Sequence, residues 1–174
     1  MAAFDFKKEY RELYLPTGQP QIVDVPEMRF IMVEGKGNPN TSESYKEAVE
    51  ILYGLSYSIK MSKKGDKVPE GYFDYVVPPL EGLWWFENNY FDGNVIGRKD
   101  EFVWIMMIRQ PEFVTQEVFE TAKEVLARKK PELNLSRARL QDFKEGLCAQ
   151  VMHIGSYDDE GPTVAALEEF LESQ

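Results

Sequence analysis

The sequence predicts an α+β fold built from two related halves. Segments typical of strand, helix, strand and strand follow one another, and the start of a second such unit comes after them. The chain of 174 residues is 43% hydrophobic and 29% charged, a composition typical of a globular protein with a sizeable core. It contains no linker long enough to separate independent domains, so we expect residues 1–174 to form one domain.

The first 28 residues mix charged and aromatic side chains without a clear period, and prolines and glycine interrupt them repeatedly. We predict an arm that lies on the domain, with residues 21–25 as a short strand. The apolar run at residues 30–33 then predicts a buried strand over residues 29–34. The glycine loop at 35–40 completes neither common phosphate-binding pattern, so it does not indicate a nucleotide site.

The first long helix is predicted to begin at a cap formed by Thr41 or Ser42 and to reach about Met61. One of its faces carries apolar residues at three- and four-residue spacing, namely Tyr45, Ala48, Val49, Leu52, Leu55 and Ile59. Tyr53 and Tyr57 lie four residues apart on the flank of this helix. We therefore expect these two side chains to point together toward a cleft beside the core.

Three extended segments and two turns are predicted after this helix. A turn at Gly65 and Asp66 precedes an alternating strand at 72–77, which Pro78 and Pro79 end. An extended run follows at 83–86, and a turn at Asp92-Gly93-Asn94 separates it from a strand at 102–109. The first repeat is therefore expected to cover about residues 21–90.

The second half, about residues 100–174, contains an inserted helix with well-marked ends. Thr115 can cap it, and a basic cluster precedes Pro131 at its end. Two strands at 136–143 and 147–154 are predicted to form a hairpin turning at Glu145-Gly146. A third helix is predicted to begin near Pro162, which suits the first turn of a helix.

Charge and composition exclude several classes of function. The net charge of −10 disfavours nucleic acid as a partner, because nucleic acid is bound through clusters of Lys and Arg. Cys148 and His153 are the only cysteine and histidine, so we expect no internal disulfide, no metal site and no cofactor. Neither a signal peptide nor a membrane-spanning run is present, and a cytoplasmic protein without membrane contact is expected.

The stretch from residue 72 to residue 104 is unusually aromatic. It holds all three tryptophans and ten of the 23 aromatic residues, more than a single hairpin with one buried face requires. These side chains could line a ligand cleft or could simply fill the core, and composition alone leaves both possibilities open. If the strand is regular, the adjacent Trp84 and Trp85 point to opposite faces of the sheet.

Three separated motifs resemble those of the stand-alone GyrI-like small-molecule-binding proteins. They are Pro-Pro-Leu-Glu-Gly-Leu-Trp-Trp at 78–85, Met-Ile-Arg-Gln-Pro-Glu-Phe-Val-Thr at 107–115, and the segment from Glu145 to Glu160. The resemblance covers nearly the whole chain from about Gln21. It implies two strand-helix-strand-strand repeats related by a pseudo-twofold axis, with antiparallel sheets and a central ligand groove between them.

The resemblance also implies what the protein does, and the sequence departs from these relatives in one respect. Relatives bind hydrophobic, often cationic compounds between aromatic walls and a carboxylate, and some open the cyclopropane ring of DNA-alkylating compounds. Such relatives continue past the third helix into a strand with a groove glutamate, which this sequence does not show. We therefore expect the second half to lack its last two strands. An exposed sheet edge would result, which predicts a homodimer.

These arguments assign the groove to named side chains. Glu81 and Glu160 lie within the motifs and are the candidate catalytic carboxylates. The ligand-binding candidates are aromatic, namely Tyr53, Tyr72, Tyr75, Trp84, Trp85, Trp104 and Tyr157. The favoured function is binding of an apolar or cationic aromatic small molecule. Alternatives are a hydrolase that opens cyclopropane rings and an acidic protein that interacts with a partner such as a topoisomerase.

Overall fold

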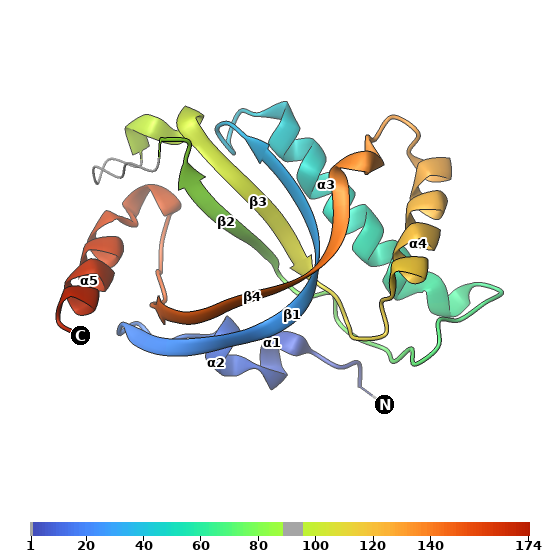
Figure 1. Cartoon of the computed structure of the whole chain (residues 1–174), viewed down its shortest axis with the longest axis horizontal. Helices are drawn as coiled ribbons and strands as arrows, with labels where there is room; N and C mark the ends of the chain where they lie inside the picture. Colours follow the sequence, from blue (N-terminus) through green and yellow to red (C-terminus); the bar gives the residue numbers. More distant parts are fainter. Residues whose placement is uncertain (1, 89–95) are drawn as a thin grey trace.

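One antiparallel sheet of four strands organises the molecule, and it curls so that two long strands sweep beneath the other two (Figure 1). The computed structural model describes residues 2–88 and 96–174. The strands are β1 (Gln21–Lys36), β2 (Leu80–Phe86), β3 (Phe102–Arg109) and β4 (Ala138–Gln150), in the spatial order β2-β3-β1-β4. The predicted α+β class and antiparallel sheet are confirmed.

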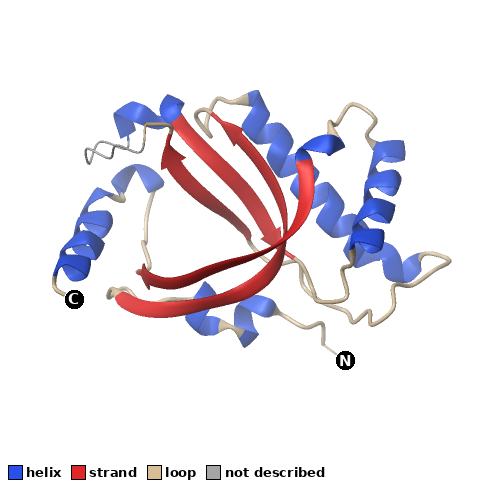
Figure 2. Ribbon diagram, viewed as in Figure 1, coloured by secondary structure: helices blue, strands red, loops and turns tan. Residues whose placement is uncertain are grey.

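Helices cover the sheet unevenly (Figure 2). The α-helices are α1 (Phe6–Glu9), α2 (Arg11–Tyr14), α3 (Glu43–Lys60), α4 (Gln116–Lys129) and α5 (Gly161–Glu172). The 3-10 helices are η1 (Met61–Lys64), η2 (Ile96–Glu101), η3 (Leu135–Arg137) and η4 (Tyr157–Asp159). Helix α3 packs on β1 and β3 and contacts α4, whereas α5 stands at the opposite end of the molecule, beyond β2.

The two long helices begin at the predicted caps. The Ser42 hydroxyl accepts a hydrogen bond from the Tyr45 backbone N–H at 3.2 Å, and the Thr115 hydroxyl accepts one from Val118 at 3.3 Å. These side chains satisfy backbone donors that a helix start leaves unpaired. The predictions for both helices are confirmed, and so is the helix that follows Glu160.

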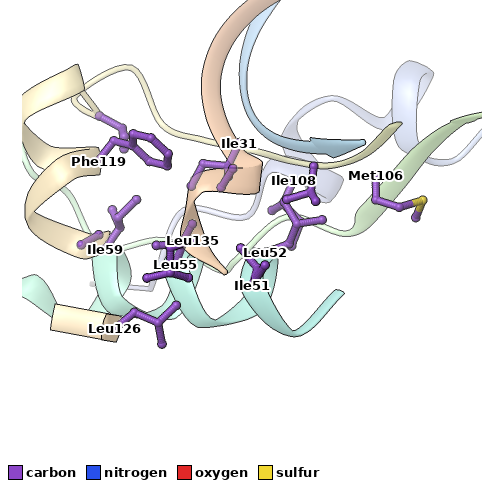
Figure 3. Close-up of a cluster of buried hydrophobic side chains, with 14 of the residues drawn as sticks. Ile31, Ile51, Leu52, Leu55, Ile59, Met106, Ile108, Phe119, Leu126 and Leu135 are labelled. Carbon is purple, nitrogen blue, oxygen red and sulfur yellow. The ribbon is translucent and has the colours of Figure 1, made fainter. Parts of the chain in front are cut away.

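The main hydrophobic core lies between the sheet and α3 with α4 (Figure 3). Ile31 from β1 and Ile108 from β3 meet Ile51, Leu52 and other fully buried side chains of α3. A smaller cluster around Phe30, Met32 and Met107 occupies the other face of the sheet. The alternation of these residues along β1 and β3 explains the continuous apolar runs in the sequence, because both faces of these strands are covered.

Strand β1 is a single strand of 16 residues, so the prediction of two strands at 21–25 and 29–34 is wrong. Pro26 interrupts the sequence pattern without ending the strand. Around Pro26, β1 pairs only with β4, and pairing with β3 begins at Phe30. A proline is tolerated where one edge of a strand is free, because its missing N–H then removes no necessary ladder bond.

The predicted hairpin at Glu145-Gly146 is also wrong. Residues 138–150 form one strand that pairs with β1 in an unbroken register, with Val25 opposite Gly146 and Val23 opposite Cys148. Gly146 has a φ of +79°, which bends the backbone in a way that glycine tolerates. The long β1 provides partners on both sides of this bend, so the chain continues along it.

The segment at 72–77 forms no regular strand, contrary to the prediction. One isolated parallel bridge links Tyr75 to Phe4 of the N-terminal arm. The alternating pattern instead reflects aromatic packing, because Tyr72, Phe73 and Tyr75 all contact Phe113. The predicted turn at Asp92-Gly93-Asn94 lies outside the described residues.

Candidate functional site

A pocket of about 770 Å³ runs along the outer edge of β2, between this strand and the beginning of α5. Its volume is within the range of small-molecule sites. The residues that line it are Pro39, Asn40, Tyr45, Leu80, Glu81, Gly82, Trp84, Trp85, Phe86, Lys99, Phe102, Met106, Tyr157, Glu160 and Val164. Because β2 is an edge strand, side chains from both of its faces reach this pocket.

Gly82 makes room for the indole ring of Trp84. A Cβ atom at position 82 would lie 2.4 Å from Trp84 Nε1 and 2.9 Å from the sulfur of Met106. Trp84 points to the α3 side of the sheet and Trp85 to the other side, as expected for neighbours in a strand. Each indole is 38% exposed, and both line the pocket.

Three further aromatic rings extend the wall that Trp84 begins. Tyr45 from α3 lies 5.8 Å from Trp84, and Phe102 from β3 lies 5.3 Å from it, measured between ring centroids. Phe86 stacks on Phe102 at 5.1 Å with an interplanar angle of 8°. Burial is the main cause of the raised pKa of Tyr45, so its hydroxyl stays protonated at neutral pH. The wall is therefore aromatic and uncharged, with its rings tilted relative to one another.

The facing wall comes from the segment that leads into α5. Tyr157, Glu160 and Val164 line the pocket from this side, and Tyr157 is 82% exposed. An ion pair between Lys99 and Asp158 ties this segment to η2. His153 bridges the Thr163 hydroxyl and the Ser156 carbonyl oxygen at 2.9 Å each.

Glu81 is the most perturbed carboxyl group of the site. Burial is the main cause that raises its pKa from 4.5 to about 7; the nearby Glu145 raises it further, and Arg109 opposes the shift. Its Oε2 atom is buried and has no hydrogen-bond partner among the described residues. A carboxyl group that titrates near neutrality can exchange protons with a ligand or with water.

Several residues assigned from the sequence therefore meet around one pocket. Glu81, Trp84 and Trp85 from β2 face Tyr157 and Glu160 from the α5 side. This grouping brings together side chains that lie more than 70 residues apart in the sequence. The roles of these residues in binding or catalysis remain predictions.

Trp104 and Tyr75 lie in the core, away from the pocket. They are 0% and 1% exposed, respectively. The Trp104 indole N–H donates to the Gly37 carbonyl at 3.2 Å, which satisfies its polar atom inside the protein. The sequence pattern could not distinguish these two core residues from Trp84, because a hydrophobic core and the wall of a pocket are built from the same residue types.

Tyr72 and Tyr53 also lie away from this pocket. The Tyr72 hydroxyl donates to the Lys60 carbonyl at 2.7 Å, and its ring packs on Phe113. Tyr53 stacks with Tyr57 at 6.4 Å on the flank of α3, so their predicted pairing is present. A second hollow of about 800 Å³ lies between α3 and α4, but none of the nine predicted site residues lines it.

Three residues that the sequence did not single out for the site add to the pocket. Tyr45 was assigned to the core face of its helix, and Phe102 to the predicted strand at 102–109 without a role in the site. Phe102 is two residues from Trp104, so the period of a strand could have placed both on one side. Nothing in the sequence indicated Lys99 as a pocket residue, because its position depends on an ion pair with Asp158, which is distant in the sequence.

Among the described residues, no group of three or more His, Cys, Asp or Glu side chains is arranged to hold a metal ion. Within the same residues, no helix is long and apolar enough to cross a membrane. Aromatic rings, carboxyl groups and one lysine are among the side chains that line the pocket.

The curled antiparallel sheet and the edge pocket place the chain among α+β small-molecule-binding domains. The chain belongs to the GyrI-like family, since the pattern of the GyrI-like small molecule binding domain matches residues 18–174. No curated protein matches the chain.

Three solved structures of Listeria innocua proteins are similar to this chain. One is described as a hydrolase; it is 46% identical, with a TM-score of 0.86 over 98% of this chain and 84% of that chain. A second, described as an uncharacterized conserved protein, is 47% identical, with a TM-score of 0.90 over 98% and 81%. A third, a hydrolase encoded by lin2189, is 46% identical, with a TM-score of 0.89 over 99% and 82%.

Proposed function

We propose that the chain binds flat aromatic small molecules, neutral or cationic, in the pocket between β2 and α5. The observation that carries this proposal is the pair of facing walls, aromatic on the β2 side and closed by Tyr157 and Glu160 on the other. Flat rings gain most from such a site, because stacking and area burial act together. The family match supports small-molecule binding in general.

The charges around the pocket favour a cation over an anion. Glu81 and Glu160 contribute carboxyl groups, whereas Lys99 is paired with Asp158. Aromatic faces also attract cations. Since Glu81 loses its proton near pH 7, we expect the affinity for a planar cation to rise as the pH rises through about 7. In Glu81→Gln, this increase should be absent.

Tryptophan fluorescence tests the binding proposal directly. Titration with the planar cation proflavine should give saturable quenching, and Trp85→Leu should weaken binding about tenfold or more, as for a central aromatic contact. Tyr57→Leu is the matched control, because Tyr57 is exposed on α3 outside this pocket. Absence of saturable quenching by proflavine and by neutral planar compounds would contradict the proposal.

A second candidate function is hydrolysis of a cyclopropane-bearing alkylating compound in the same pocket. The specific observation is the Glu81 carboxyl, with a pKa near 7 beside an aromatic wall. Two of the similar solved structures are described as hydrolases. Their names do not give a substrate, so the cyclopropane ring rests on the resemblance in the sequence motifs.

The reaction would add one water across a strained carbon–carbon bond. A new C–O bond forms at one ring carbon as the C–C bond breaks, and its electron pair passes into a conjugated carbonyl. Glu81 would take a proton from the water, and the carbonyl oxygen would receive one. Mass spectrometry should show the mass gain of one water with the wild type and a strongly slowed reaction with Glu81→Gln. Unchanged compound after long incubation with stoichiometric wild type would exclude this function.

A further inference from the structure

Three polar atoms from three separate elements are buried without a hydrogen-bond partner near Glu81. They are the Tyr14 hydroxyl at the end of α2, Oε2 of Glu81 on β2 and Nη1 of Arg109 on β3. Five such side-chain atoms occur among the described residues, so most of them gather at this one place. The three groups lie close together. Glu81 is the cross-strand partner of Met107, two residues before Arg109 on the same face of the sheet, and Tyr14 is one helical turn from Tyr10, whose ring the Arg109 guanidinium contacts. Burial is the main cause of the raised pKa of Tyr14, and the charges of Glu81 and Arg109 act on it as well.

The N-terminal arm is firmly attached where it contributes Tyr14. Phe4 exchanges backbone hydrogen bonds of 2.9 and 2.8 Å with Asp74 and Val76. The Arg109 guanidinium contacts two arm rings, 4.6 Å from the centre of Phe6 and 4.4 Å from that of Tyr10. These contacts hold a cation over aromatic faces and keep Arg109 only 6% exposed.

The other terminal guanidinium nitrogen of Arg109, Nη2, lies 4.0 Å from Glu112 Oε1. Nη1 has no hydrogen-bond partner among the described residues. A buried polar atom without a hydrogen-bond partner destabilises the folded protein, so three of them close together indicate a missing common partner.

The donor and acceptor pattern defines the chemistry of that partner. Arg109 Nη1 and the Tyr14 hydroxyl can each donate a hydrogen bond, and an ionised Glu81 accepts one. A hydroxyl oxygen satisfies all three, because it accepts two hydrogen bonds and donates one.

We propose that Tyr14, Glu81 and Arg109 form a subsite for one hydroxyl oxygen, supplied by a hydroxyl group of the bound aromatic ligand or by a water molecule. This subsite rests on the proposed function, because Glu81 also lines the aromatic pocket. The arm that carries Tyr14 precedes the family match at residues 18–174, so this part of the site lies outside the family pattern.

Paired ligands test whether the hydroxyl comes from the ligand. Serotonin and tryptamine are both cationic bicyclic aromatics and differ by one hydroxyl group. Isothermal titration calorimetry should show that the wild type binds serotonin about five- to tenfold more tightly. Tyr14→Phe keeps the ring and should abolish this preference. Tyr57→Phe, on the exposed flank of α3, should preserve it.

NMR of the Glu81 carboxyl carbon tests the subsite in the ligand-free protein. If a water molecule fills the subsite, removing the Tyr14 hydroxyl withdraws one of the hydrogen bonds that hold this water against the ionised carboxyl, so Tyr14→Phe should raise the Glu81 pKa further. The charged groups facing Glu81 are Arg109 and Glu145, and they are unchanged in this variant. A purely structural role of Tyr14 would leave this pKa where it is.

The two experiments together separate the outcomes. A serotonin preference lost in Tyr14→Phe supports a ligand hydroxyl, whereas equal binding of both amines with a raised Glu81 pKa supports water. Equal binding with an unchanged pKa would overturn the subsite and leave the pocket proposal standing. If neither amine binds, the proposed binding of cationic aromatics fails, and the pKa measurement alone decides the subsite.

Discussion

At the scale of single residues, neighbours in the Glu81-Gly82-Leu83-Trp84-Trp85 segment perform different tasks. Gly82 leaves space for the Trp84 ring, and Glu81 points to the opposite face, toward Arg109 and Glu145. The period of two along a strand produces this division, because adjacent side chains face opposite sides. One short motif thus provides both an aromatic wall and a buried carboxyl group.

The Glu81 carboxyl should make stability depend on pH with a definite sign. The folded protein keeps its proton up to about pH 7, whereas the unfolded chain loses it near pH 4.5. The folded state therefore loses stability relative to Glu81→Gln as the pH rises between these values. Since each pKa unit corresponds to about 1.4 kcal/mol, we expect a change of up to about 3 kcal/mol. Urea unfolding at pH 4 and pH 8 measures this difference; a difference independent of pH would contradict the prediction.

At the scale of elements, the sheet accommodates large rings by placing glycine opposite them. Gly35 on β1 is the cross-strand partner of Trp104 on β3, and a Cβ atom there would lie 2.4 Å from the indole ring. This close approach keeps Trp104 fully buried between the sheet and α3. Gly35, the first residue of the glycine loop at 35–40, therefore has a structural role: it leaves space for the Trp104 ring.

Gly35→Ala should destabilise the protein by about 1–3 kcal/mol, because a fully packed core must move to accept the methyl group. Gly18→Ala is the control, since no atom lies within 4 Å of its added methyl group. Thermal unfolding should show a clear decrease in Tm for Gly35→Ala and almost none for Gly18→Ala. Equal effects of the two substitutions would show that the close approach to Trp104 is not the cause.

Two of the errors in element prediction, the divided first strand and the hairpin, share one physical origin. Pro26 and Gly146 are typical signals for ending a strand, yet both lie inside long strands that pair with each other. Local signals report what a short peptide prefers, whereas the 16-residue β1 provides a template that overrides them. The three longer helices, α3, α4 and α5, were predicted from local features of their ends and apolar faces, whereas the short helices α1 and α2 of the arm were not predicted.

At the scale of the whole molecule, the outer edge of β4 has no strand partner among the described residues. Leu147 on β4 is 78% exposed, and Ile154 just beyond it is 88% exposed. An open strand edge with apolar side chains favours pairing with another chain, so the homodimer remains our prediction.

Light scattering coupled to size-exclusion chromatography tests the dimer. We expect a dimer for the wild type and a shift toward monomer for Leu147→Lys, because charge on an edge strand opposes pairing. Tyr57→Lys, at another exposed site, should leave the mass unchanged. A wild type that is monomeric at all concentrations would contradict the prediction.

The sequence by itself determined the α+β class, the long helices with their caps, and the motif that carries Glu81 and Trp84, because these depend on local spacing and residue type. Only the tertiary structure decided which aromatic side chains are core and which line the pocket. Trp104 is buried because it lies on a central strand beneath α3, whereas Trp84 is half exposed on the adjacent edge strand. Strand order is a long-range property, and it separates two tryptophans that are equivalent in their local sequence pattern.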